Sequence, residues 1–173
     1  MRELLLLRHG KSDWAVRGQP DHERELTKRG RKASRRMGQW VVDNDCVPNA
    51  VVASPATRTK QTAERFCRAA AIGGAVNWEP RIYEATVGTL LMVLASAPPV
   101  ARVLLIGHNP GMEGLARYLA NQIPEPDDHN LFPTATLGRI TLPDDWRQLD
   151  PGCGTMLSLV RPRELGQRGE LGD

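Results

Sequence analysis

The chain has 173 residues, of which 40% are hydrophobic and 25% are charged, and its formal net charge is +3. This composition is ordinary for one soluble globular domain and excludes an intrinsically disordered chain. No apolar run approaches the roughly 18 residues of a membrane helix, so a membrane protein is excluded as well.

The first part of the chain predicts a buried strand, a polar loop and an amphipathic helix. Four consecutive leucines at residues 4–7 are typical of a strand that is covered on both faces. Residues 11–25 are polar and interrupted by glycine and proline, which predicts a loop. Thr27 is a suitable N-cap for a helix over residues 28–43, because the apolar residues of that segment fall on one helical face.

Strands and helices alternate along the rest of the chain. In chain order we expect a strand at 49–53, a helix from Pro55 to about residue 70, a weaker strand at 75–83, a helix at 86–96, a strand at 101–106, a helix opening at Pro110, a loop at 123–133, and strands at 136–142 and 155–160. The alternation predicts one α/β domain over residues 1–162, a three-layer α/β/α sandwich with a mostly parallel central sheet. Residues 163–173 are expected to form a flexible tail.

Polar clusters follow three of the predicted strands. They are Arg8-His9-Gly10, Ser54 with Arg58, and Gly107-His108-Asn109. Because the carboxyl ends of parallel strands meet at one edge of a sheet, we expect these clusters to form one crevice. Arginine offers forked donors that match phosphate oxygens, and a neutral imidazole can attack phosphorus. The two histidines and two arginines of these clusters therefore predict an anion pocket.

Four motifs carry a family resemblance. They are RHG at 8–10, LTKRG at 26–30, SPATRTKQTA at 54–63 and GHNPG at 107–111. In this order they resemble the histidine phosphatase superfamily, which also contains the cofactor-dependent phosphoglycerate mutases. Within it, the RHGKSDW opening, YEA at 83–85, FPTAT at 132–136 and the LVRPREL ending look most like SixA-type phosphohistidine phosphatases. The resemblance implies a phosphoglycerate mutase-like fold over about residues 2–165.

The resemblance also implies roles for individual residues. His9 would accept the phosphoryl group and form a phosphohistidine intermediate that water later hydrolyses. Arg8, Arg58 and His108 would hold the phosphoryl oxygens and stabilise the charge of the transition state. Glu84 is the candidate for the acid that protonates the leaving group.

We further expect Gly10, Ser12 and Asn109 to bind substrate. Asn109 has a second interpretation as the cap of the helix that opens at Pro110, and Ser54 is expected to be an N-cap rather than a nucleophile. No metal and no cofactor are expected. The three widely spaced cysteines predict neither a disulfide framework nor a zinc knuckle, and they favour a cytoplasmic location.

The predicted function is the metal-independent hydrolysis of phosphohistidine on protein by a monomer. Mutase activity is disfavoured, because Ala15 replaces the asparagine usual in mutases and the chain is too short for their insertions. One alternative is a small-molecule phosphomonoesterase of the same superfamily, and a second is a phosphate-binding regulatory module without turnover. Neither nucleic acid nor membrane is expected as a partner, since basic residues are interleaved with acidic ones and no basic cluster contains aromatic residues.

Overall fold

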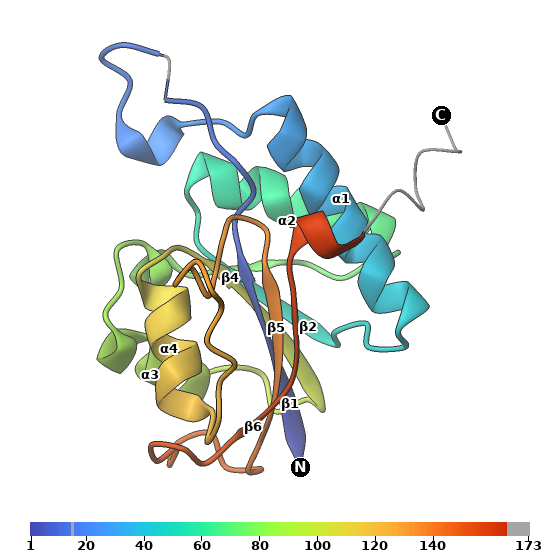
Figure 1. Cartoon of the computed structure of the whole chain (residues 1–173), viewed down its shortest axis with the longest axis vertical. Helices are drawn as coiled ribbons and strands as arrows, with labels where there is room; N and C mark the ends of the chain where they lie inside the picture. Colours follow the sequence, from blue (N-terminus) through green and yellow to red (C-terminus); the bar gives the residue numbers. More distant parts are fainter. Residues whose placement is uncertain (15, 166–173) are drawn as a thin grey trace.

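The computed structural model describes residues 1–14 and 16–165, which form one α/β domain around a six-stranded sheet (Figure 1). The strands are β1 (Arg2–Arg8), β2 (Ala50–Ala53), β3 (Asn77–Trp78), β4 (Arg102–Gly107), β5 (Leu137–Leu142) and β6 (Thr155–Val160). The helices are α1 (Lys28–Asp43), α2 (Thr57–Ala69), α3 (Val87–Ala95) and α4 (Gly111–Leu119), with 3-10 turns η1 (Asp21–Glu23), η2 (Pro80–Ile82) and η3 (Pro162–Leu165).

The sheet is mostly parallel, as the alternation of elements predicts. Its strand order is β3-β2-β4-β1-β5-β6. The first four strands of this order run parallel to one another. β5 pairs antiparallel with β1, and β6 pairs antiparallel with β5. β1 and β4 are therefore central, which explains why both are continuous apolar runs.

The leucine run of β1 belongs to two separate cores. Leu4 and Leu6 pack in the core that contains the buried residues of α3 and α4. Leu5 and Leu7 pack in the core that contains those of α1 and α2. Because successive side chains of a strand point to opposite faces, one short run supplies both cores. The result is the predicted three-layer sandwich, with α1 and α2 on one face of the sheet and α3 and α4 on the other (Figure 1).

Some boundaries differ from the sequence-based expectations. α1 spans the predicted residues, and the Thr27 hydroxyl caps it by accepting the N–H of Gly30 at 3.0 Å. α2 begins at Thr57 rather than Pro55, because the backbone at Ala56 is still extended. The weak strand at 75–83 shrinks to the two residues of β3, since the Glu79 carboxylate caps the η2 turn that follows directly.

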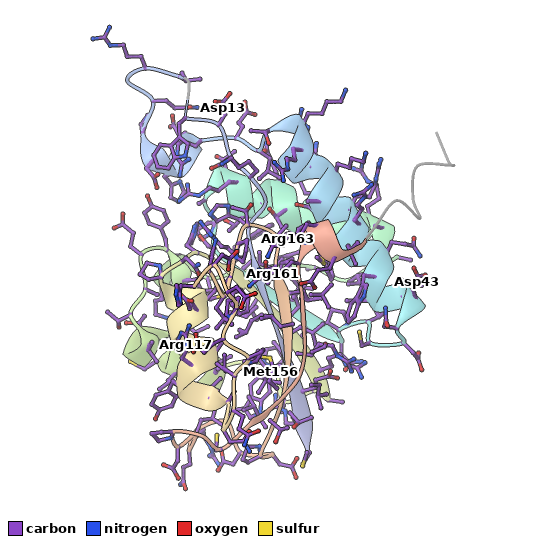
Figure 2. The ribbon with its side chains drawn as sticks, viewed as in Figure 1. Asp13, Asp43, Arg117, Met156, Arg161 and Arg163 are labelled. Carbon is purple, nitrogen blue, oxygen red and sulfur yellow. The ribbon has the colours of Figure 1, made fainter. Side chains whose placement is uncertain are left out.

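The expected tail begins with an ordered turn. Residues 162–165 form η3, and Leu165 packs against the core under α1. Arg161 and Arg163, both labelled in Figure 2, form ion pairs with Asp128 at 3.5 and 3.4 Å. The remainder of the expected tail, residues 166–173, lies outside the described residues. Within the described ranges, no helix is long and apolar enough to cross a bilayer.

Candidate active site

The three polar clusters predicted from the strand ends meet at one edge of the sheet. The parallel pairing of β1 with β4 places Arg8 beside Gly107, and that of β2 with β4 places Ala53 beside Ile106. A pocket of about 640 Å³ opens over these carboxyl ends. Its lining includes seven of the eight predicted site residues, namely Arg8, His9, Ser12, Arg58, Glu84, His108 and Asn109.

Gly10 is the predicted site residue that the pocket lining does not include. Its N–H donates to the Thr62 hydroxyl at 3.0 Å. A Cβ at this position would lie 2.6 Å from the carbonyl oxygen of Gly30, which is far inside van der Waals contact. Gly10 therefore allows α1 to approach the strand end closely and supports the site from behind.

His9 follows the last residue of β1, is only 6% exposed, and has a fixed ring orientation. Its Nδ1 lies 2.7 Å from the carbonyl oxygen of Gly10. A carbonyl oxygen only accepts, so Nδ1 carries the proton and Nε2 carries the lone pair. Burial lowers the pKa of His9 to about 3, and the nearby His108 and Arg58 act in the same direction. The imidazole is thus neutral near pH 7, with Nε2 available as a nucleophile.

Arg58, in the first turn of α2, reaches His9 with its Nε. This N–H donates to His9 Nε2 at 3.4 Å. Its two other nitrogens are held by one residue of the polar loop: Nη1 donates to the Asp21 carbonyl oxygen at 2.8 Å and Nη2 to the Asp21 carboxylate at 3.0 Å. Asp21 therefore fixes the guanidinium so that its Nε edge faces the nucleophile.

Asp21 is the central residue that sequence reasoning missed. Its carboxylate accepts from Tyr83 Oη at 2.6 Å and from Arg24 Nε at 2.9 Å, in addition to Arg58. The Tyr83 hydrogen bond, followed by the arginine contacts, holds the pKa of this carboxyl far below its usual range. Tyr83 belongs to the YEA motif, but nothing in the spacing of the sequence pairs it with Asp21, 62 positions away.

His108 lies on the other side of the nucleophile, at the end of β4. Its ring centroid is 5.3 Å from that of His9 and 5.4 Å from that of Tyr83. Burial, followed by the charge of Arg58, lowers the pKa of His108 to about 3. Its Nε2 is 2.8 Å from the Ser54 hydroxyl. The prediction of Ser54 as an N-cap was wrong, because this buried hydroxyl orients His108 and the residue at the N-cap of α2 is Ala56.

Arg8 and Asn109 share one acceptor at the back of the pocket. Arg8 Nη1 and Asn109 Nδ2 both donate to the carbonyl oxygen of Phe132 at 2.9 Å. The Asn109 side-chain oxygen accepts from the N–H of Glu113 at 3.2 Å, so both ends of this amide are engaged within the fold. The residue at the N-cap of α4 is Pro110, but Asn109, one position earlier, still accepts a first-turn N–H of that helix.

Two polar atoms of the site are buried without a hydrogen-bond partner among the described residues. They are Arg8 Nε and His108 Nδ1. A buried polar group without a partner costs about 1–3 kcal/mol. Arg8 Nε can only donate, so it favours a ligand that brings an oxygen acceptor. Phosphate is a ligand of this kind.

The two remaining predicted residues of the pocket lining are Ser12, which is buried, and Glu84, which is exposed. Ser12 Oγ accepts from Arg24 Nη1 at 2.7 Å, which ties it to the arginine that also holds Asp21. Glu84 is exposed and lines the pocket from a left-handed backbone conformation, with φ of 55°. A non-glycine residue in this conformation is uncommon, and such strain concentrates at functional sites. In the described part of the chain, no group of three or more His, Cys, Asp or Glu side chains is placed to hold a metal ion.

Comparison with known sequences places these motifs in a family. The family model of the histidine phosphatase superfamily, branch 1, matches residues 4–93. An uncharacterized protein of Mycobacterium tuberculosis is 29% identical over 164 residues, which cover 91% of this chain and all of that protein. A second uncharacterized protein, chloroplastic and from Arabidopsis thaliana, is 29% identical over 131 residues and is covered to 59%.

Solved structures agree with the sequence comparison. The protein histidine phosphatase SixA complexed with tungstate superposes with a TM-score of 0.80 at 25% identity, covering 94% of this chain and 99% of that one. The putative phosphohistidine phosphatase SixA from Agrobacterium tumefaciens gives a TM-score of 0.76 at 26% identity, covering 93% and 98%. The chain belongs to the histidine phosphatase superfamily and is of the SixA type.

Proposed function

We propose that this protein is a phosphatase that hydrolyses phosphohistidine on proteins through a covalent intermediate on His9. One observation carries the proposal. The hydrogen bond from His9 Nδ1 to Gly10 fixes the tautomer, and Arg58 Nε donates to the unprotonated Nε2 at 3.4 Å. A neutral nucleophile thus stands beside a guanidinium that is suited to hold a phosphoryl oxygen.

In the first step, His9 Nε2 attacks phosphorus and forms a P–N bond. The bond from phosphorus to the substrate's leaving atom breaks, and its electron pair goes to that atom together with a proton. In the second step a water molecule attacks the phosphohistidine, inorganic phosphate leaves, and His9 returns to its neutral form. Arg8, Arg58 and His108 line the pocket around the nucleophile and would hold the phosphoryl oxygens through both steps.

Glu84 is our candidate for the proton donor to the leaving atom. It lines the pocket at its exposed rim, where a leaving group would depart. Asp21 also lines the pocket, but its bonds to Tyr83 and two arginines hold it in the ionised form. An acid must carry a proton at the working pH, so Asp21 does not suit the role.

The choice of a protein substrate follows from the relatives. The two SixA structures match nearly the whole chain at 25–26% identity. Glucosyl-3-phosphoglycerate phosphatase of mycobacteria, which acts on a small molecule, matches at 19% identity and shares the fold. The likeness therefore supports the SixA-like substrate over a small phosphate ester. The cytoplasmic location and the monomeric state stay predictions.

The test compares the native protein with His9→Asn on two substrates, a phosphohistidine-bearing protein and p-nitrophenyl phosphate, without added metal. Loss of the nucleophile is expected to lower the rate by about a thousandfold or more. His129→Asn is the matched control, because it makes the same change in an exposed loop and asparagine tolerates the positive φ at that position. Activity on the ester alone would favour the small-molecule alternative, and equal rates for the native protein and His9→Asn would overturn the mechanism.

A further inference from the structure

The net positive charge of this protein comes from one short segment. Residues 28–36 contain six Lys or Arg and no Asp or Glu. The rest of the chain contains 17 Lys or Arg against 20 Asp or Glu, so its net charge is negative. The expectation of interleaved charges is therefore wrong for this segment, which accounts for the whole positive balance.

Folding places five of these six side chains on one face of α1. The residues that α1 buries are Gly30, Ser34, Met37, Gly38 and Val41. At 100° per residue, Lys28, Arg29, Lys32, Arg35 and Arg36 lie on the opposite half of the helix. Arg31 lies at the border of this surface, half-buried, and its Nη1 donates to the Leu26 carbonyl oxygen at 2.8 Å. We call this surface the basic face.

The basic face is not explained by the stability of the helix. None of the six cations of residues 28–36 forms an ion pair with an acid among the described residues. Three of them lie in the first four residues of α1, where the positive end of the helix dipole disfavours cations, and the first turn has no acid. Charges that repel one another and the dipole are a cost to folding, which favours a function outside the fold.

The basic face reaches the rim of the catalytic pocket. A smaller groove of about 200 Å³ lies next to that pocket and is lined by Arg29 of α1. Lys11 and Thr134 line both cavities, so the groove adjoins the pocket. Arg161 and Arg163 line the groove as well, beside the one acid in its lining, Asp128 (Figure 2). A basic track thus runs from the nucleophile over Lys11 to α1.

We propose that the basic face docks an acidic stretch of polypeptide that flanks the phosphorylated histidine of the substrate. This inference rests on the proposed function. It adds that the protein prefers substrates with acidic residues next to the phosphohistidine. Complementary charges next to a site raise the association rate and select among partners. A nucleic acid fits less well, because residues 28–36 contain no aromatic side chain on which a base would stack and the track ends in the catalytic pocket.

The test uses two synthetic phosphohistidine peptides of equal length, one with Glu and one with Gln at the flanking positions. At an ionic strength of about 20 mM, the native protein is expected to hydrolyse the acidic peptide with a kcat/KM about tenfold higher than the neutral one. At about 300 mM this preference is expected to shrink, because salt screens exposed charges.

The double variant Arg29→Glu with Lys32→Glu is expected to abolish the preference and to leave p-nitrophenyl phosphate hydrolysis unchanged. Neither residue lines the catalytic pocket. An acid in the first turn interacts favourably with the helix dipole, so the Tm of the double variant is expected to equal or exceed that of the native protein. The matched control, Arg68→Glu with Arg147→Glu, makes the same change in net charge at exposed sites away from the pocket and is expected to keep the preference.

The outcomes separate this inference from the proposed function. If neither peptide is hydrolysed but p-nitrophenyl phosphate is, the proposed function fails and the inference fails with it. If both peptides are hydrolysed equally, or if the α1 variant keeps the preference, the docking role is wrong while the function stands. The proposal is overturned if the two peptides are hydrolysed with equal kcat/KM and a labelled DNA duplex binds the native protein but not the α1 variant. The basic face would then bind nucleic acid.

Discussion

Asp21 accepts two hydrogen bonds from Arg58. Its carbonyl oxygen accepts from Nη1 at 2.8 Å, and its carboxylate accepts from Nη2 at 3.0 Å. Asp21 lies in the turn η1 and Arg58 in the first turn of α2, so the contact ties the polar loop to the catalytic edge of the sheet. Both nitrogens engaged by Asp21 are donors that a phosphate would otherwise use. Asp21 therefore either orients Arg58 for catalysis or competes with the substrate phosphate for the hydrogen-bond donors of Arg58.

We expect Asp21→Asn to lower kcat by about ten- to a hundredfold, since a guanidinium displaced by about 1 Å stabilises the transition state less well. KM is expected to change less than kcat. The measurement is steady-state kinetics with p-nitrophenyl phosphate, and Tyr83→Phe is the control that removes one hydrogen bond to Asp21 but keeps its charge. A higher rate in Asp21→Asn would show instead that Asp21 competes with the phosphoryl group for Arg58.

Ser54→Ala is expected to lower activity about tenfold, because it removes the hydrogen bond that orients the His108 ring. The Ser54 hydroxyl is fully buried and lies 2.8 Å from His108 Nε2, so its loss leaves a buried polar atom without a partner. The cost to the free energy of unfolding is about 1–3 kcal/mol. Ser34→Ala makes the same change at a fully buried serine of α1, whose hydroxyl donates to the Gly30 carbonyl oxygen. Equal activities of the two variants would show that Ser54 has no role in positioning His108.

Acid is expected to destabilise this protein at a mildly acidic pH. The folded-state pKa of His9 and of His108 is about 3, well below the ordinary histidine value of 6.5. Between these values the unfolded chain binds protons that the folded protein does not, so stability falls as the pH falls from about 6.5. The slope is about 1.4 kcal/mol per pH unit for each histidine.

Urea unfolding at a series of pH values measures this slope. His9→Asn removes one of the two buried imidazoles and is expected to halve the slope between pH 6 and about 4. His129→Asn removes an exposed imidazole and serves as the control. A native protein whose stability did not change over this range would show that the buried imidazoles titrate normally.

Gly30→Ala is expected to destabilise the fold and to disturb the catalytic loop together. A Cβ at Gly30 would lie 2.1 Å from the carbonyl oxygen of Lys11, two positions after the nucleophile. Because the clash is with backbone, the loop or the helix must move, at a cost of about 1–3 kcal/mol or more. Gly73→Ala is the control, since a Cβ there meets nothing within 4 Å. The free energy of unfolding and kcat of both variants are the measurements, and a Gly30→Ala variant with native values would contradict the close approach.

Several residues that line the pocket were predictable because they lie just after strands. The leucine run of β1 and the apolar run of β4 can only be buried strands, and polar residues at their carboxyl ends meet by the geometry of a parallel sheet. His9, Arg58 and His108 were therefore expected to meet, and all three line one pocket. The motifs around them were enough to name the family.

The sequence by itself determined the fold class, the order of the elements and the chemical type of the site, because periodicity and strand-end position are local properties of the chain. Only the tertiary structure decided which loop residues hold that site. Asp21 and Tyr83 come from segments without periodicity, and Ser54 turned from an expected cap into the partner of His108. Such contacts depend on how loops approach one another in three dimensions, and no spacing along the chain encodes that approach.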